Sequence, residues 1–475
     1  MSDLYADFTV TGLSAGLRAG EITAEALAIE VIERCERHSD LRALISQDQE
    51  ALLRSARQAD QLQASGAKLG LLHGIPLVIK DNIDTLGLPT SGGTPALEND
   101  VPQHNAPSLQ RLLDAGALVA GKGNLHELAV GGTSDNLYFG RVKNPYRLEL
   151  NAGGSSGGPA AAVAARMAPA GLGTDTNGSV RGPCAHSGIA GFRPSFQRYP
   201  FGGVFPSAPT RDSVGPMATT VDDLALLDAI LSGTENRLPQ IDISGLRLGL
   251  SSPYSEEVLD ERTAAVMQDA LALLRDLGAV IVEADIPGLS AMTHRAAWPI
   301  TSYEVAVEMP RYLAHRGTEV TIDDIVKNIA SEVVKERFSP KFYDQTGQRA
   351  KYEEVMQTHR PALQAAIQAY YDEHLVVAML FPTTPFPATR LNGEDPDMEI
   401  NGKPVTNGFG HVIDHTIHQS AAGVPSLTVP AGLTSDGLPV GINFDGPFST
   451  DRTLLAIALA FEAARGPLPP PPGFG

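Results

Sequence analysis

Two loops rich in glycine and serine contain the residues of this sequence that are best suited to nucleophilic chemistry. The first has the sequence NAGGSSGG at residues 151–158, and the second has GTDTNGSVR at residues 173–181. Dense glycine lets backbone N–H groups converge, and converging N–H groups stabilise an oxyanion. A serine in such a loop becomes a nucleophile only when a base lies within reach. Ser155 and Ser179 are therefore candidate nucleophiles, provided that the chain supplies a base.

A lysine is the best candidate for that base. The twelve histidines are scattered, and none belongs to a recognisable triad pattern, whereas Ser–Lys pairs also carry out acyl transfer. Lys80 follows the apolar residues 77–79. Burial at the end of a strand would lower its pKa towards the working pH, where the neutral amine accepts a proton. Lys122 is the rival, but its glycine neighbours favour a surface turn.

These loops also allow two other interpretations. A single glycine-rich loop is more often structural than catalytic. The spacing Gly153-x-Ser155-x-Gly157 also fits the nucleophile elbow of α/β-hydrolases, which requires an apolar strand directly before the serine. Residues 146–151 have a poor strand pattern, so the elbow interpretation is disfavoured.

Taken together, three motifs resemble the amidase signature family of Lys–Ser–Ser amidohydrolases. They are the lysine motif at residues 74–82 and the two glycine-rich loops, with 75 residues between Lys80 and Ser155 and 24 between Ser155 and Ser179. Later motifs also match, so the resemblance runs almost end to end: DSVGPMA at 212–218, GVP at 423–425 and GLPVG at 437–441. One loop alone is weak evidence, whereas several motifs in the family's order and spacing are specific.

The resemblance implies a role for each residue of this set. Ser179 would attack the acyl carbon, and Ser155, preceded by a cis peptide bond at Gly154–Ser155, would pass the proton between Ser179 and Lys80. The backbone N–H groups of Thr176, Asn177, Gly178 and Ser179 would form an oxyanion hole. Asp175 and Arg181 would form an ion pair that braces the loop. Ala129, Gly131 and Gly132 would line the path of the substrate.

The same resemblance implies a hydrolase that cleaves an acyl carbon–nitrogen bond other than a peptide bond, through an acyl-enzyme and without a cofactor. Family members hydrolyse amides, carbamates, ureas and hydrazides, so hydrazidase and urethanase activities are open beside amidase activity. Residues 90–97 and 192–194 are more similar to stand-alone aryl or small-amide hydrolases. The alternatives are the glutaminase subunit of a tRNA-dependent amidotransferase, which needs a partner chain, and a non-catalytic small-molecule binding protein.

Two positions depart from the family pattern. Asn177 stands where the family usually has glycine. Because Asn tolerates positive φ, the shape of the loop survives, but a side chain then faces the site or its wall. Residues 182–184 are Gly-Pro-Cys, where the family commonly has Ile-Pro or Val-Pro followed by Ala. This second departure concerns the acyl pocket and not the mechanism, and we expect Cys184 to have a packing role.

A separate polar group contains His411, Asp414, His415 and His418. On one helix the histidines, spaced i, i+4 and i+7, would share a face and could hold a metal. There is no glutamate in an H-E-x-x-H arrangement. We therefore expect a polar pocket wall or a partly exposed face, and no metal.

The elements that must position these residues alternate between strand and helix patterns. A buried strand should end at Lys80, a helix is expected at 107–116, and the next strand is expected at 118–120. Further strands are expected at 246–251, 279–284, 375–381 and 426–429, and helices at 12–38, 221–232, 260–277, 353–372 and 451–465. This alternation predicts an α/β fold, with a central mixed β-sheet sandwiched by helices.

The middle region, residues 290–420, has less strand pattern and more aromatic residues. We expect it to form a helical cap or insertion with the substrate pocket, inside a single amidase signature domain that spans residues 1–475. Most of its large aromatic side chains should lie in the core, and one or two should line an acyl pocket: Trp298, Tyr303, Phe338, Phe342 and Tyr343.

Composition restricts the class of protein further. A formal net charge of −19 disfavours nucleic acid and an anionic membrane surface as partners. Two cysteines are too few for a disulfide framework, and residues 1–4 show no signal peptide. The sequence therefore predicts a cytoplasmic enzyme, a monomer or homodimer, that acts on a small-molecule amide-type substrate.

Overall fold

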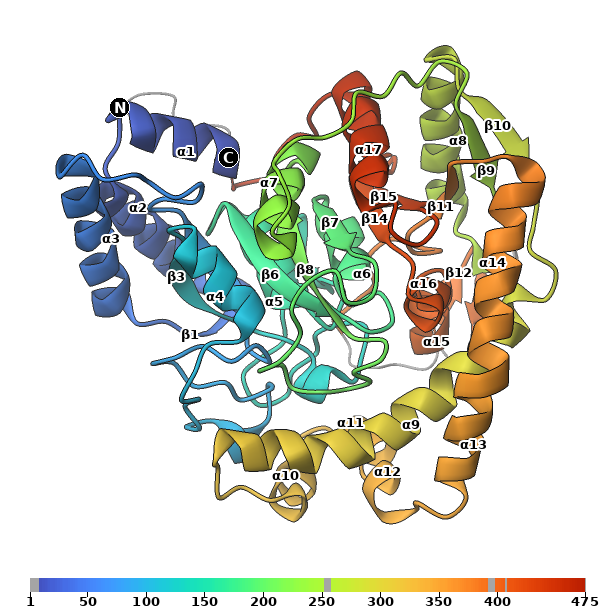
Figure 1. Ribbon diagram of the computed structural model, residues 1–475, viewed down its shortest axis with the longest axis horizontal. Coiled ribbons are helices and arrows are strands. Elements are labelled where there is room, and N and C mark those ends of the chain that lie inside the picture. The colour runs from blue at the N-terminus through green and yellow to red at the C-terminus, as the bar shows by residue number, and fades with distance from the viewer. Residues whose placement is uncertain (1–7, 252–257, 392–397, 406–407, 475) are drawn as a thin grey trace.

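An eleven-stranded mixed sheet runs through the molecule (Figure 1). The computed structural model describes residues 8–251, 258–391, 398–405 and 408–474. The strand order in the sheet is β1-β3-β2-β6-β8-β7-β14-β15-β11-β9-β10. In chain order these strands are β1 (Leu44–Ser46), β2 (Pro76–Lys80), β3 (Leu118–Gly123), β6 (Ala170–Asp175), β7 (Ala190–Arg193), β8 (Ser213–Ala218), β9 (Arg247–Leu250), β10 (Val280–Glu283), β11 (Ala378–Pro382), β14 (Ser426–Leu433) and β15 (Pro439–Asp445).

The direction of the strands changes along the sheet. Strand β2 lies parallel to both of its neighbours, β3 and β6. From β6 through β8, β7, β14 and β15 to β11 each pair is antiparallel, and β11, β9 and β10 are again parallel. Every residue of β2 and β6 is buried, as expected for strands that are covered on both faces. The predicted mixed sheet is confirmed.

Helices flank the sheet in two packed groups. Helix α5 (Gly157–Ala164) packs on β2, β6 and α6 (Arg181–Ser187), and all of its residues are buried. Its Gly/Ala-rich sequence therefore permits close approach to the sheet. A second group packs on the strands of the other half: α7 (Val221–Ser232), α8 (Glu261–Asp276) and α17 (Asp451–Arg465). The remaining helices of the first half are α1 (Val10–Ala19), α2 (Ala24–Arg37), α3 (Gln49–Ala64) and α4 (Pro107–Asp114).

The middle region is mostly helical and forms the lower and right-hand edge of the molecule in Figure 1. It contains α9 (Leu289–Arg316), α10 (Ile322–Asn328), α11 (Glu332–Phe338), α12 (Pro340–Tyr343), α13 (Gln348–Glu354), a π-helical turn (Val355–His359) and α14 (Arg360–His374). After β11 come the hairpin β12 (Met398–Ile400) and β13 (Lys403–Val405), then α15 (Gly408–Asp414) and α16 (Ile417–Ala422). Two hydrophobic clusters separate from the main core hold this insertion together. The predicted helical insertion is confirmed.

Several predicted elements differ from the observed ones. The helix expected at 12–38 is two helices, because Gly20 adopts φ 72° and ends α1, while the Thr23 hydroxyl caps α2. Residues 147–151 do form a strand, β5 (Arg147–Asn151), but it lies outside the central sheet, where it pairs with β4 (Lys143–Asn144) and forms a bridge to Arg390 through Leu150. No helix in the described ranges is long and apolar enough to cross a membrane.

For the five aromatic residues named in the middle region, the expectation that most lie in the core is wrong. Of the five named, Phe338 is fully buried, at 1% exposure, and Phe342 packs partly against the same cluster. Trp298 and Tyr343 are exposed, at 38% and 61%. Tyr303 stacks on Tyr352 with ring centroids 4.5 Å apart.

Candidate active site

Lys80 is the last residue of β2, and its side chain is fully buried. Its Nζ lies 2.8 Å from Ser155 Oγ and 2.8 Å from Thr174 Oγ1. Burial lowers the pKa of Lys80 to about 7, although the negative charges of Asp175 and Asp212 act in the opposite direction. A large fraction of this amine is therefore neutral near pH 7, as a base requires.

Thr174 was missed by sequence reasoning. Its hydroxyl lies between two donors, since Asn82 Nδ2 also donates to Thr174 Oγ1 at 3.0 Å. Thr174 stands in β6, directly beside β2 in the sheet. This contact fixes the direction of the Lys80 amine towards Ser155. Its place in the second glycine-rich motif was the only pattern that could have indicated it.

Ser155 follows a cis peptide bond at Gly154–Ser155. Its carbonyl accepts hydrogen bonds from the backbone N–H of His126, at 3.1 Å, and from Ser134 Oγ, at 3.2 Å. At Gly154, a Cβ would lie 2.7 Å from the backbone nitrogen of Ser134, so only glycine fits. The first glycine-rich loop is thus held against residues 126–134.

Ser179 lies in the loop between β6 and α6 and is partly exposed. The Ser156 N–H donates to the Ser179 carbonyl at 3.2 Å, which joins the two serine-containing loops directly. Each serine precedes a buried helix, α5 or α6, and these helices pack on one another. The fold therefore joins Lys80 to Ser155 by a hydrogen bond and holds the backbone of Ser179 against the loop that contains Ser155.

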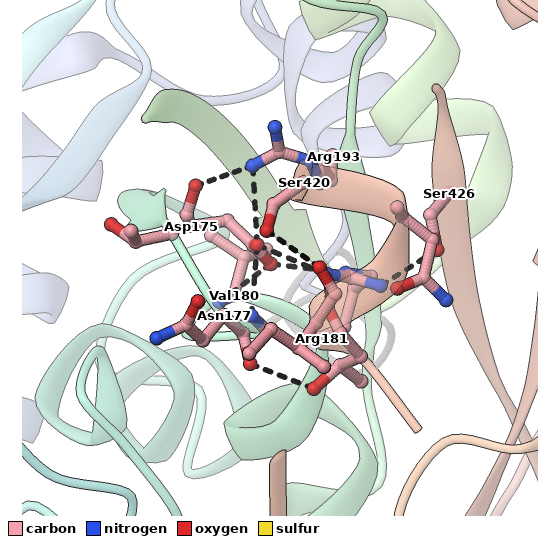
Figure 2. Close-up of polar contacts among 12 residues, drawn as sticks. Asp175, Asn177, Val180, Arg181, Arg193, Ser420 and Ser426 are labelled. Carbon is pink, nitrogen blue, oxygen red and sulfur yellow. Dashed lines mark hydrogen bonds and ion pairs between the residues drawn. The ribbon is translucent and has the colours of Figure 1, made fainter. Parts of the chain in front are cut away.

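Asp175 is the centre of the second loop (Figure 2). Its carboxylate accepts hydrogen bonds from the N–H groups of Gly178, at 2.9 Å, and Val180, at 3.2 Å. It also forms buried ion pairs with Arg181, at 3.0 Å, and Arg193, at 3.3 Å. Burial alone would raise the pKa of Asp175, but the two guanidinium groups hold it well below its usual range. The carboxylate is therefore charged and rigidly held.

The other end of Arg181 reaches the C-terminal part of the chain. Its Nη1 donates to Ser426 Oγ at 2.9 Å, and its Nη2 donates to the Thr416 carbonyl at 2.6 Å. The Thr416 hydroxyl in turn donates to the Asn177 carbonyl at 2.7 Å. At Gly178, with φ 101°, a Cβ would stand 2.0 Å from Thr416 Oγ1. This loop therefore requires glycine at position 178.

The side chain of Asn177 is held by Arg211, another residue that sequence reasoning missed. The fully buried Arg211 donates from Nη2 to Asn177 Oδ1, to the Thr176 carbonyl at 3.2 Å and to Ser420 Oγ at 2.9 Å. Arginine carries only donors, so the amide oxygen of Asn177 faces Arg211 and its NH₂ group faces away. Arg211 directly precedes the motif at 212–218, and nothing in its local pattern indicated this contact.

The four N–H groups expected in the oxyanion hole are not equivalent. The Gly178 N–H donates to Asp175, so it is already occupied. Within the described part of the chain, the N–H groups of Asn177 and Ser179 donate no hydrogen bond to protein atoms. The Thr176 hydroxyl donates to Asp212 Oδ1 at 2.6 Å, which fixes the start of the turn.

The loop predicted to line the path of the substrate lies against the first glycine-rich loop. A Cβ on Gly154 would stand 2.9 Å from the carbonyl carbon of Gly132, and one on Gly131 would overlap the His126 ring. Ala129 adopts φ 58° in this loop. Glu127 fixes the loop to the helical insertion, because its carboxylate accepts the N–H groups of Ala330 and Ser331. The loop thus stands beside Ser155.

The expectation that Lys122 lies in a surface turn is wrong. Lys122 is fully buried in β3, where its Nζ lies 3.2 Å from Asp81 Oδ1 and donates to Thr90 Oγ1 and the Ile83 carbonyl. It neutralises a buried carboxylate instead of approaching a serine. Cys184 does pack as expected, in an apolar cluster with Val180.

The four residues of the histidine group do not share one helical face, because the chain leaves α15 at Asp414 and begins α16 only at Ile417. His411 Nδ1 lies 3.2 Å from Asp414, His415 Nδ1 lies 2.7 Å from the Pro382 carbonyl, and His418 Nε2 lies 3.0 Å from Asp445. The described residues contain no group of three or more His, Cys, Asp or Glu side chains that could hold a metal.

Comparisons with known proteins show to which family this chain belongs. The family profile described as Amidase matches residues 26–455. Indoleacetamide hydrolase of Rhizobium radiobacter is 40% identical over 436 residues, covering 92% of each chain. Mandelamide hydrolase of Pseudomonas putida is 35% identical, covering 98% of this chain and 93% of that one. The glutamyl-tRNA(Gln) amidotransferase A component of Chromohalobacter salexigens is 34% identical, covering 96% of each.

Solved structures are also similar to this chain. The X-ray structure of native peptide amidase from Stenotrophomonas maltophilia superposes with a TM-score of 0.80 and 28% identity, covering 98% of this chain and 99% of that one. The chain therefore belongs to the amidase signature family and is a hydrolase of amide-type carbon–nitrogen bonds.

Proposed function

We propose that this enzyme hydrolyses small amides through an acyl-enzyme on Ser179, with Ser155 as proton relay and Lys80 as base. The observation that carries the proposal is the buried Lys80 amine, whose Nζ lies 2.8 Å from Ser155 Oγ and whose pKa burial lowers to about 7. A lysine in that state can accept a proton at neutral pH, which an exposed lysine does rarely.

In the first half-reaction Ser179 Oγ attacks the carbonyl carbon. Its proton passes to Ser155 Oγ as the Ser155 proton passes to Lys80 Nζ. The carbonyl oxygen becomes an oxyanion, which accepts hydrogen bonds from the N–H groups of Asn177 and Ser179. When the intermediate collapses, the carbon–nitrogen bond breaks, and the leaving nitrogen takes a proton back through Ser155 from Lys80.

In the second half-reaction water replaces the amine. A water molecule gives a proton to the same relay and attacks the acyl carbon. The bond between that carbon and Ser179 Oγ breaks, Ser179 regains its proton, and the acid leaves. All protons return to their starting positions, so the cycle consumes only water and the amide.

The substrate that we propose is the primary amide of an aryl-substituted acetic acid. Its support is the similarity to enzymes named for indoleacetamide and for mandelamide, both of which are such amides. The amidotransferase component is similar at lower identity, 34% against 40%, so a glutaminase partnered with other chains is the less supported alternative. Carbamates and hydrazides are tested beside the amides.

The deciding experiment measures turnover and the covalent intermediate together. Phenylacetamide, indole-3-acetamide, mandelamide, a phenylacetyl hydrazide, a phenyl carbamate and glutamine are offered to the purified chain. We expect the arylacetamides to be hydrolysed fastest. With hydroxylamine present, the acyl group should appear as a hydroxamate. Preference for glutamine would contradict the proposed substrate class.

The first prediction is that Ser179→Ala lowers kcat by about 10³-fold or more, because the nucleophile is lost. Rapid quench and mass spectrometry of the wild type should place the acyl adduct on the peptide that contains Ser179. Ser108→Ala is the matched control, since the buried Ser108 hydroxyl in α4 has no hydrogen-bond partner among the described residues. An adduct on another residue, or a Ser179→Ala variant with more than trace activity, would contradict the mechanism.

A further inference from the structure

Gly182 is the second residue of α6 and follows Ser179 by three positions. The Gly182 N–H donates to the Gly178 carbonyl at 2.8 Å. The Cys184 N–H donates to the Val180 carbonyl at 3.1 Å, so helical hydrogen bonding already begins at the Gly178 carbonyl. Residues three positions apart share one face of such a turn. Gly182 and Ser179 therefore lie on the same face of the turn.

Gly182 differs from the other glycines of the two serine-containing loops in the space around it. An added Cβ would stand 2.9 Å or less from another atom at each of six glycines: Gly153, Gly154, Gly157, Gly158, Gly173 and Gly178. At Gly182 the nearest described atoms outside its own helix would be the Gly154 carbonyl oxygen and Thr384 Cγ2, each 4.0 Å away. Gly182 is nevertheless buried. Its missing side chain thus leaves room for at least a methyl group, beside the loop that contains Ser155.

Neither the backbone nor the packing requires glycine at position 182. Its φ lies outside the left-handed region that favours glycine, and within a helix glycine is less favourable than alanine. A proline at 183 disfavours the helical conformation for a preceding residue with a Cβ. Isoleucine or valine before this proline is nevertheless common in the family, so the fold accepts a side chain here. The space itself is therefore the best explanation for Gly182.

The walls of this space carry no charge. The Thr384 hydroxyl donates to the Phe386 carbonyl at 3.0 Å, while its methyl group is the part nearest to Gly182. One turn further along α6, His186 Nε2 lies 3.2 Å from the same carbonyl, which holds residues 384–386 against the helix. Burial lowers the pKa of His186 to about 4, so its ring is neutral at pH 7. Such surroundings suit an apolar group and disfavour a carboxylate.

We propose that Gly182 sets the size of the acyl group that this enzyme accepts, by leaving room for an apolar substituent on the acyl carbon. The inference rests on the proposed function, because the bond to Ser179 Oγ is what places the acyl carbon. The substituent extends along the face that Ser179 shares with Gly182, towards Thr384. An aryl ring, as in an arylacetamide, needs this room, whereas a short alkyl chain does not.

The test compares two primary amides that release the same ammonia, phenylacetamide and propionamide. Their kcat/KM values are measured for the wild type, Gly182→Ala and Gly182→Val. The ratio of phenylacetamide to propionamide should fall about tenfold in Gly182→Ala and about 100-fold in Gly182→Val, since one methylene in a pocket changes a rate by about 10–200-fold. A merely structural glycine would lower both values in equal proportion, and that result would overturn the proposal.

Gly432→Ala, in β14, is the matched control. Its φ also lies outside the left-handed region, and an added Cβ would meet the Val266 side chain at 3.1 Å. The ratio of the two amides should stay at the wild-type value in this variant. Thermal unfolding accompanies the kinetics, and Gly182→Ala should melt within about 3 °C of the wild type, because its Cβ displaces no described neighbour.

Binding separates this inference from the catalytic proposal. In the Ser179→Ala protein, which lacks the proposed nucleophile, calorimetry measures the binding of phenylacetamide. Addition of Gly182→Val should weaken that binding about tenfold or more, whereas addition of Gly432→Ala should not. A wild type that hydrolyses neither amide, together with this loss of binding, would contradict the catalytic proposal alone. Equal binding with and without Gly182→Val, no binding of phenylacetamide, or an unchanged ratio in turnover would overturn the role of Gly182.

Discussion

At the scale of single residues, the pairing of Asp175 with two arginines limits how strongly its negative charge raises the pKa of Lys80. A bare carboxylate near Lys80 would favour the protonated amine and raise its pKa. Asp175 is instead paired with Arg181 and Arg193, both fully buried. Its negative charge is therefore largely offset, and desolvation dominates at Lys80. The ion pairs brace the loop and also keep the base available.

The second prediction follows from that pKa. Because only neutral Lys80 accepts a proton, kcat/KM should fall tenfold per pH unit below about pH 7 and level off above it. Lys80→Arg keeps the charge but does not lose a proton at ordinary pH, so activity should drop about 10²–10⁴-fold. A pH–rate profile and the Lys80→Arg variant check this. A flat profile between pH 5 and pH 8, or an active arginine variant, would contradict Lys80 as base.

The third prediction concerns stability. The pKa of Lys80 is lower in the folded state, about 7, than the ordinary value of 10.5. The unfolded chain therefore binds the extra proton between these values, and the stability of the wild type rises with pH through this window. Lys80→Met lacks the effect. The stability of the wild type relative to Lys80→Met should rise by about 2–3 kcal/mol from pH 7 to pH 9. Denaturant unfolding at the two pH values measures it, and an unchanged difference would contradict the buried, neutral lysine.

The fourth prediction separates structure from chemistry at Asn177. Asn177→Asp keeps an acceptor for Arg211 and adds an ion pair, so the melting temperature should not fall. It also places a negative charge beside the N–H groups expected to hold the oxyanion, so kcat should drop at least about tenfold. Asn177→Gly leaves the buried Arg211 short of one acceptor and should cost about 1–3 kcal/mol. An aspartate variant with the wild-type kcat would contradict the position of the oxyanion.

At the scale of elements, the strands that sequence reasoning found and those that it missed differ in composition. Strands β2 (PLVIK) and β10 (VIVE) contain runs of branched aliphatic residues, so a periodicity search detects them. Strands β6 (AGLGTD) and β8 (SVGPMA) are central but rich in glycine and small residues. Their small residues allow α5 and the neighbouring loops to approach closely, a requirement set by packing partners far along the chain.

Gly121 and Gly123, on either side of Lys122, led to a wrong prediction for a similar reason. They indicated a turn, yet a Cβ on Gly121 would stand 2.9 Å from the Ser46 carbonyl oxygen, and one on Gly123 would stand 2.7 Å from Pro159 Cγ. Both glycines permit close contact inside the sheet. Glycine in a short apolar segment marks either a turn or a tight approach, and one sequence alone does not distinguish the two.

The fifth prediction tests the glycine requirement in the second loop. Gly178 and Gly437 both have positive φ, 101° and 85°, but of the two only Gly178 has a described neighbour within 4 Å of an added Cβ. Gly437→Ala should therefore cost only the backbone strain, about 1–2 kcal/mol. Gly178→Ala must also displace Thr416, so it should cost more and should reduce kcat strongly. Thermal unfolding and kinetics of both variants are compared; equal effects would contradict the role of Thr416.

At the scale of the whole molecule, the helical insertion is attached to the first part of the chain by an apolar cluster, which includes Leu97 and Leu128, and by a few buried polar contacts. Arg316, at the end of α9, donates to the Thr90 carbonyl at 3.0 Å and pairs with Asp84, at 3.4 Å, and Asp100, at 3.0 Å. Glu127 makes the second attachment through Ala330 and Ser331. Glu127 also begins the loop beside Ser155. The insertion therefore contacts the loop of the candidate site through the Glu127 carboxylate.

The distant partners of the site could not be predicted from local patterns. Lys80, Ser155 and Ser179 stand in recognisable motifs, and so do Asp175 and Arg181. Arg211, Thr416 and Ser420 complete the loop from residues that are ordinary in their own neighbourhoods. The sequence motifs therefore contain the groups that we propose to react, whereas the support around them depends on which strands become neighbours.

That support has a consequence for how the protein is made. Every residue proposed to react lies between positions 80 and 179, yet strand β14, which begins at Ser426, inserts beside β7 and supplies an acceptor for Arg181. A nascent chain on the ribosome therefore contains all the residues proposed to react before strand β14, which supports Arg181, has been synthesised. We therefore expect a chain that ends before Ser426 to leave Arg181 without this acceptor and to be inactive towards amides.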